Sequence, residues 1–118
     1  MNIRRFSELV GVSAYTLRYY EKVGLLRNIT RNASGHRSYT QKDVEWIQFI
    51  IRLKETGMDL EGIKQYADLR ELGDSSLQQR KQLLELHRNK LKSEIENQLA
   101  HLKALDGKIA FYDDKICS

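Results

Sequence analysis

The N-terminal part of the chain alternates short apolar patterns with glycines and polar breaks, which is typical of short helices joined by tight turns. Apolar side chains recur at helical spacing from residue 3 to residue 10, and Gly11 ends the pattern. Ser13 is a suitable N-cap for a second helix over 14–23, and Gly24 follows it where a positive φ is favoured. Because only a short turn separates these helices, the pattern predicts a helix-turn-helix.

A polar stretch over 27–40 follows the second helix. Asn, Ser and Gly gather near its middle, so we expect a small two-stranded hairpin, a wing, with its tip near Ser34 and Gly35. Thr40 then begins a third helix that is apolar nearly all round as far as Leu53. Such a helix must be covered on more than one face.

A fourth helix is predicted to begin after Asp59, a good N-cap, and to end at Gly73. Its apolar residues recur with helical spacing, so one face should be directed inward. The predicted inner face consists of Leu60, Ile63, Tyr66, Ala67 and Leu69.

The last part of the chain has a different pattern, since apolar positions from about 74 to 114 are separated by alternating steps of four and three residues. With no Pro and one Gly, this segment predicts a single helix about 60 Å long. Its stripe needs a partner helix, most simply that of a second copy; the alternative is folding back on the preceding helices. The predicted dimerisation residues are Leu84, Leu91, Ile95, Gln98, Leu102, Leu105, Ile109 and Tyr112, with Gln98 as a polar break that can fix the register.

Charge is unevenly distributed along the chain. The 118 residues include 20 Lys or Arg and 16 Asp or Glu, a net charge of +4. Residues 1–40 contain seven Lys or Arg and two Glu, so the whole positive excess lies in the first third. A basic segment joined to a near-neutral remainder is typical of a nucleic-acid binder, although a solvated face without function would look the same.

Composition excludes several classes of protein. One Cys cannot form an intramolecular disulfide or an all-Cys zinc site. No apolar run has the length of a signal peptide or of a membrane span. No catalytic Ser, His and Asp set, phosphate loop or metal-ligand cluster has useful spacing, so we expect a cytoplasmic protein that is not an enzyme and uses no cofactor or metal.

In a helix-turn-helix the second helix enters the major groove of DNA. Arg18 is the best candidate for a base contact, because its planar fork can pair with guanine, while Thr16 and the Tyr hydroxyls suit phosphate oxygens. Tyr20 could instead share the inner face of the helix, and Tyr39 could brace the wing. The predicted DNA-binding residues are Tyr15, Thr16, Arg18, Tyr19, Tyr20, Lys22, Arg31, His36, Arg37 and Tyr39.

Several of these segments together resemble the N-terminal domain of the MerR family of bacterial transcription regulators. They are Ser13–Glu21, Gly24–Leu26, Arg31, Gly35–Tyr39 and Gly57–Ile63. The resemblance implies a mainly α fold, with a winged helix-turn-helix domain over 1–73 and a dimerisation helix over 74–118 that forms an antiparallel coiled coil. It also implies that the homodimer binds a palindromic element of double-stranded promoter DNA and distorts it, so that bacterial RNA polymerase can engage the promoter.

Within that family the chain is most similar to the short aldehyde- and electrophile-responsive subgroup, which has no C-terminal ligand domain. Better-known members of the subgroup have a reactive Cys in the third helix, where this sequence has Arg52. Metal sensors have a Cys at the start of the dimerisation helix, where this sequence has Gly73–Ser76. Cys117 is the one thiol of the chain, and it does not lie at either of these sensing positions. The sequence therefore does not identify the effector.

Two other functions fit parts of the pattern. An architectural or excisionase-like DNA-binding protein, without effector sensing, could use a similar winged helix. A coiled-coil adaptor could use its basic domain to bind an acidic protein, and would lack salt-dependent affinity for a DNA palindrome. The long helix favours the regulator, because a dimer sets the spacing of two half-sites on DNA.

Overall fold

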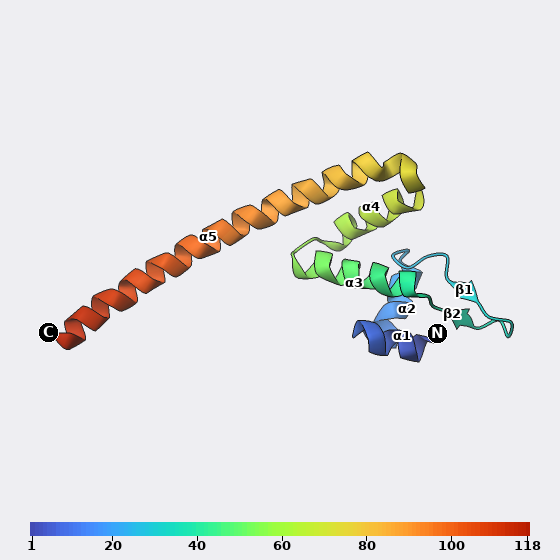
Figure 1. Cartoon of the computed structure of the whole chain (residues 1–118), viewed down its shortest axis with the longest axis horizontal. Helices are drawn as coiled ribbons and strands as arrows, with labels where there is room; N and C mark the ends of the chain where they lie inside the picture. The colour runs from blue at the N-terminus through green and yellow to red at the C-terminus, as the bar shows by residue number, and fades with distance from the viewer. The chain divides into compact units, whose positions relative to one another are not determined.

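The computed structural model describes residues 1–118 and divides into two compact units, Met1–Arg80 and Lys81–Ser118. Helices dominate both units, which confirms the predicted mainly α fold (Figure 1). The elements in chain order are α1 (Ile3–Val10), α2 (Ala14–Lys22), β1 (Thr30–Arg31), β2 (Arg37–Ser38), α3 (Gln41–Glu55), α4 (Leu60–Glu71), the short 3-10 helix η1 (Gly73–Ser76) and α5 (Leu77–Cys117).

The first two helices form the predicted helix-turn-helix. Gly11 has a φ of 69°, a left-handed conformation that favours glycine and turns the chain after α1. Ser13 caps α2, since its side chain accepts a hydrogen bond from the backbone N–H of Thr16 at 3.1 Å. The Ser7 hydroxyl donates to the carbonyl of Val12 at 2.6 Å and so ties the turn to α1.

The core of the N-terminal unit is built around α3, which packs against α1 and α4. Ile47 and Ile50 are completely buried, as the apolar pattern of this helix required. Trp46 is also buried, and its indole N–H donates to the carbonyl of Leu25 at 2.7 Å. That bond satisfies a buried carbonyl in the segment after α2 and thereby fixes the segment to α3.

The wing is the two-stranded antiparallel hairpin of β1 and β2, in which Thr30 pairs with Ser38 and Arg31 with Arg37. Its two strands are short and exposed, so it has little apolar packing of its own. The wing is anchored where it ends, because the ring of Tyr39 stacks on that of Phe6 with centroids 4.5 Å apart.

The fourth helix confirms part of its predicted inner face, on which Tyr66 and Leu69 are half-buried. Ile63 and Ala67 are buried, whereas Leu60 is 45% exposed, so its assignment to the inner face was wrong. Leu60 is the first residue of α4 and directly follows the N-cap Asp59, where the chain has only begun to approach α3. The helix also ends at Glu71, two residues before the predicted end.

The last helix begins at Leu77 rather than near residue 74, because η1 intervenes. Ser76 is completely buried, and its hydroxyl donates to the carbonyls of Leu69 and Gly73, the second at 2.9 Å. The guanidinium of Arg80 donates to the same Gly73 carbonyl at 2.8 Å. The compact N-terminal unit thus extends to Arg80, while the division of function at residue 73 stays a prediction.

The 41 residues of α5 form one uninterrupted helix without a single buried side chain. Along its predicted stripe, Leu84 and Leu91 are half-buried, while Ile95, Leu102 and Ile109 are 50%, 53% and 59% exposed. Such a row of exposed apolar side chains is unusual for a helix of a soluble monomer. No helix combines the length and the apolar composition that crossing a membrane requires.

The bond between Trp46 and Leu25 can be tested by Trp46→Phe, which keeps a buried ring but removes the donor. We expect the free energy of unfolding to fall by about 1–3 kcal/mol, the typical cost of leaving a buried carbonyl unpaired. Denaturant unfolding at one protein concentration measures the change, with the exposed neighbour Gln48→Ala as control. Equal values for the two variants would contradict the assigned role of this bond.

Candidate nucleic-acid interface

The second helix presents one face to the core and the other to solvent. Leu17 and Tyr20 are buried, and helical geometry therefore turns Tyr15, Arg18 and Tyr19 outward. Tyr15 is 82% exposed and Tyr19 is 43% exposed. An exposed aromatic and cationic face on the second helix of a helix-turn-helix is suited to contact with DNA.

The turn of the wing is held by its own side chains. The Asn32 side-chain oxygen accepts from the backbone N–H groups of Ser34 and His36 at 3.0 and 3.1 Å. Gly35 has a φ of 81°, which a residue with a Cβ adopts only at a cost. Arg31 donates to the Gly35 carbonyl at 2.8 Å, so the guanidinium lies beside the tip of the wing.

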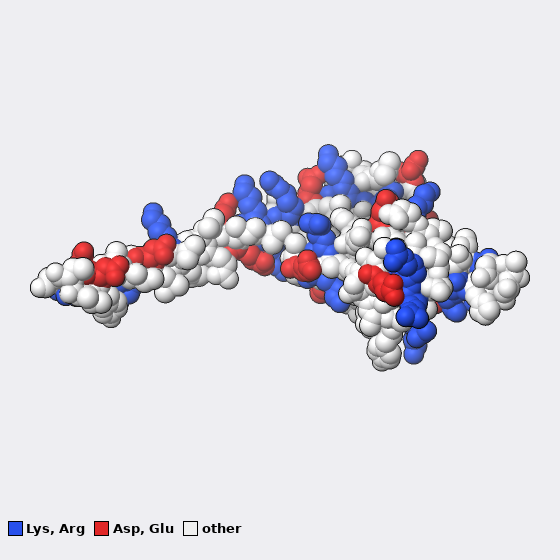
Figure 2. Space-filling view, turned by 60° about the horizontal axis from the view of Figure 1, so that its bottom comes forward, with Lys and Arg blue, Asp and Glu red and all other residues white.

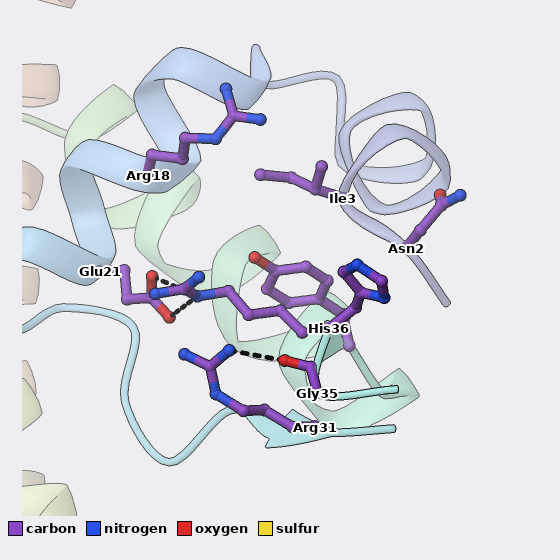
Figure 3. Close-up of a pocket in the computed structure, with 9 residues that line it drawn as sticks. Asn2, Ile3, Arg18, Glu21, Arg31, Gly35 and His36 are labelled. Atoms are coloured by element: carbon purple, nitrogen blue, oxygen red, sulfur yellow. Dashed lines mark hydrogen bonds and ion pairs between the residues drawn. The ribbon is translucent and has the colours of Figure 1, made fainter. Parts of the chain in front are cut away.

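A cleft of about 510 Å³ lies between α2 and the wing, and α1 contributes to its rim. Figure 3 shows Arg18 on α2, with Arg31 and His36 on the wing and Ile3 across the opening. The residues that line it are Asn2, Ile3, Arg18, Glu21, Arg31, Gly35, His36, Arg37 and Tyr39. Three Arg, one His and a single carboxylate make this cleft a region of positive charge, which suits a phosphate backbone.

The carboxylate in the cleft links the wing to the second helix. The Nε of Arg37 lies 2.9 Å from Oε1 and 2.8 Å from Oε2 of Glu21, an ion pair drawn with dashed lines in Figure 3. The hydrogen bond to Glu21, together with the charge of the carboxylate, raises the pKa of Arg37 above its ordinary value. Arg37 therefore has a partner within the chain, in addition to its predicted contact with DNA.

The structure corrects two members of the predicted interface. Tyr20 is 4% exposed and its hydroxyl accepts from the Lys54 ammonium at 3.0 Å, so it is a core residue. Tyr39 is 3% exposed and stacks on Phe6, so it braces the wing from below. Burial raises the pKa of the Tyr39 phenol, and the charge of Glu21 adds to the effect.

The other predicted DNA-binding residues lie where contact is possible. Lys22 is exposed at the end of α2, whereas Thr16 is half-buried and accepts a hydrogen bond from the Ser13 hydroxyl at 2.9 Å. Arg18, Arg31, His36 and Arg37 share the cleft, while Tyr15 and Tyr19 lie on the solvent face of α2 outside its lining. Their roles on DNA stay predictions.

Sequence reasoning missed the role of Glu21. It is one of only two acidic residues among the first 40, and an isolated acid in a basic segment was the available signal. Two other links were also missed: Arg27 forms an ion pair with Asp68, and Asn28 donates to Glu71 at 2.9 Å. Both links join the segment before the wing to α4, across more than 40 residues of sequence.

Two family models match the chain. The MerR HTH family regulatory protein model matches residues 1–70, and the model described as MerR, DNA binding matches residues 44–108. An uncharacterized HTH-type transcriptional regulator of Haemophilus influenzae is 41% identical over 106 residues, which make up 90% of this chain and 78% of that protein. AdhR, an HTH-type transcriptional regulator of Bacillus subtilis, is 38% identical over 77% of this chain and 65% of its own length.

Solved structures agree with these matches. A MerR family transcriptional regulator from Listeria monocytogenes superposes with a TM-score of 0.87 at 40% identity, over 96% of this chain and 86% of that one. HiNmlR, a MerR family regulator lacking the sensor domain and bound to promoter DNA, has a TM-score of 0.82 at 38% identity, over 96% and 90% of the two chains. The matches favour the regulator over the architectural protein and the adaptor, while the electrophile-responsive subgroup stays a prediction. The chain belongs to the MerR family of DNA-binding transcription regulators.

Proposed function

We propose that the protein binds a palindromic promoter element as a homodimer and controls transcription by changing the shape of that DNA. The observation that carries the proposal is the cleft between α2 and the wing, in which Arg18, Arg31 and His36 lie together. The protein acts by binding DNA rather than by catalysis. It does so in the cytoplasm, where bacterial RNA polymerase is its partner at the promoter.

The two parts of the interface have different tasks on DNA. The exposed face of α2 enters the major groove, where Arg18 can donate to O6 and N7 of a guanine. The wing lies along the sugar-phosphate backbone, where Arg31 and His36 contribute charge and hydrogen bonds but no direct sequence reading. Rigid attachment of the wing to α2 through Glu21 would keep these contacts in a constant relation.

Dimerisation is the reason why we expect the DNA site to be palindromic. The exposed stripe of α5 pairs with that of a second copy, and a dimer with two-fold symmetry presents two recognition helices to inverted half-sites. We expect the duplex to bend or twist when both interfaces are engaged, and the protein would control promoter geometry in this way.

The role of Arg18 can be tested on sites selected from random duplex DNA, which we expect to contain two inverted half-sites. Arg18→Ala should weaken binding to such a site by about 1–3 kcal/mol and relax the preference at one base pair in each half-site. Repeating the selection with the variant measures both effects, with Arg52→Ala on α3 as a control outside the cleft. An unchanged preference would rule out base reading by Arg18.

The role of Arg37 can be tested by the salt dependence of DNA binding. If Arg37 contacts a phosphate, Arg37→Ala weakens binding to all sequences and reduces the slope of log affinity against log salt by about one. The matched variant Glu21→Gln removes the charge that holds Arg37, so it should leave that slope unchanged or increase it. If Arg37→Ala leaves the slope unaltered, Arg37 acts only as the link between the wing and α2.

The role of the α5 stripe can be tested by Leu102→Asp. A charge in an apolar seam should disperse the dimer into monomers, and DNA affinity should fall with it. Sedimentation equilibrium gives the oligomeric state, and Ala100→Asp is the control because position 100 lies on the opposite face of the helix. A dimer of Leu102→Asp that persists at low concentration would show that the stripe packs elsewhere.

A further inference from the structure

The wing is attached to the N-terminal unit at both of its ends. The end after β2 is held by the stacking of Tyr39 on the first helix and by the pairing of Arg37 with Glu21. At the other end, the chain passes through Arg27 and Asn28, and β1 begins only two residues after Asn28. The attachment at this end depends on α4, a helix that contributes no residue to the lining of the cleft.

Two carboxylates of α4 hold the chain ahead of β1. The Arg27 guanidinium donates to Asp68 and, through Nε, to the carbonyl of Gly24 just after α2. The Asn28 amide donates to Oε1 of Glu71 at 2.9 Å. Asp68 and Glu71 are three residues apart on α4, so they lie on one face of the helix and contact two consecutive residues of the chain.

The backbone changes direction where these contacts are made. Asn28 has a φ of 57° and is the one residue other than glycine with a positive φ. Asn adopts this left-handed conformation more readily than most residues do. A side-chain contact at this turn therefore restricts the direction in which the chain continues into β1.

Asp68 and Glu71 cannot bind the phosphates of DNA themselves. Acidic side chains lie among basic ones on the surface in Figure 2, and each carboxylate repels the backbone of a duplex. Both residues are exposed, and exposed contacts of this kind contribute little to the stability of a fold. What the two carboxylates do contribute is a fixed place for the segment that leads into the wing.

We propose that Asp68 and Glu71 are positioning residues that hold the wing where Arg31 and His36 reach the DNA backbone. This inference rests on the proposed contact between the wing and the backbone, and it gives α4 a part in DNA binding without a contact of its own. The wing needs such support because its strands are short and exposed. Cations that are already held in place lose less conformational freedom on binding, which favours the bound state.

Two double variants with the same net charge can test these links. The alanine pair, Asp68→Ala with Glu71→Ala, removes the acceptors. The amide pair, Asp68→Asn with Glu71→Gln, removes the charges but keeps an oxygen that accepts a hydrogen bond. The loss of two negative charges strengthens DNA binding equally in both pairs, so the difference between them measures positioning.

We expect the alanine pair to bind a labelled duplex, selected from random DNA, about three- to tenfold more weakly than the amide pair. Titration of the duplex with each full-length variant measures the two dissociation constants. Denaturant unfolding is expected to show that both pairs are folded under the conditions of the titration. Equal dissociation constants would overturn the proposal.

Asn28→Gly provides a second test that leaves α4 unaltered. Glycine adopts the same positive φ, so the turn of the backbone is kept while the side-chain donor is lost. The variant should weaken DNA binding by about two- to fivefold, and Glu71→Ala should weaken it no further, because both changes remove the same bond. Unchanged binding by Asn28→Gly, or fully additive effects of the two changes, would contradict the assigned role of this bond.

Double-mutant cycles determine which part of the interface the links serve. The difference between the alanine pair and the amide pair should largely disappear when Arg31→Ala and His36→Ala remove the cations of the wing. It should persist with Arg18→Ala, which alters only α2. A difference that persists without the wing cations would assign the links a general structural role and overturn the positioning of the wing.

The wing variant alone separates this inference from the proposed function on which it rests. Arg31→Ala with His36→Ala should bind the duplex more weakly than the unmodified protein. If it binds equally well, the wing makes no contact with DNA, and both the proposed task of the wing and its positioning by α4 are overturned. If it binds weakly while the alanine pair and the amide pair bind equally, the positioning alone is overturned.

Discussion

The N-terminal unit depends on the covering of α3 from all sides. A helix with apolar residues nearly all round cannot remain at a surface, so α1 and α4 pack against it and the segment after α2 is drawn onto it. The hydrogen bond from Trp46 to Leu25 makes that packing more specific, because its geometry is met only when the segment lies in one position against α3. Since this segment leads into the wing, the position of the wing depends on the core.

Local features of the fold could be predicted from the sequence because they depend on neighbours in the chain. Ser13 and Asp59 cap helices as expected, and Thr40 with Asp43 forms a complete capping box. The last helix could also be predicted, because the same spacing of apolar residues is repeated along its whole length. One apolar residue beside the stripe was not predicted to belong to it. Leu99 lies one turn after Ile95 and is exposed, but it does not fit the alternating steps of four and three residues.

Other features could not be predicted because they depend on contacts between distant residues. The pattern of α2 did not decide whether Tyr20 is buried. Its burial depends on residues distant in the chain, and the Lys54 ammonium on α3 donates to its hydroxyl. Tyr39 follows a short polar strand, and its burial depends on Phe6 from the first helix. The pairing of Glu21 with Arg37 links residues that are 16 positions apart, through a fold that their spacing does not specify.

The links from Arg27 and Asn28 to α4 have a consequence for the thermodynamics of recognition. A wing on a loose tether would lose conformational freedom when it met DNA, and that loss would oppose binding. Here the segment before the wing is linked to Asp68 and Glu71 in the folded chain, which restricts its freedom before any DNA is bound. The entropic penalty therefore falls on the folding equilibrium, and a larger share of the interaction energy at the duplex is left to bend or twist the DNA.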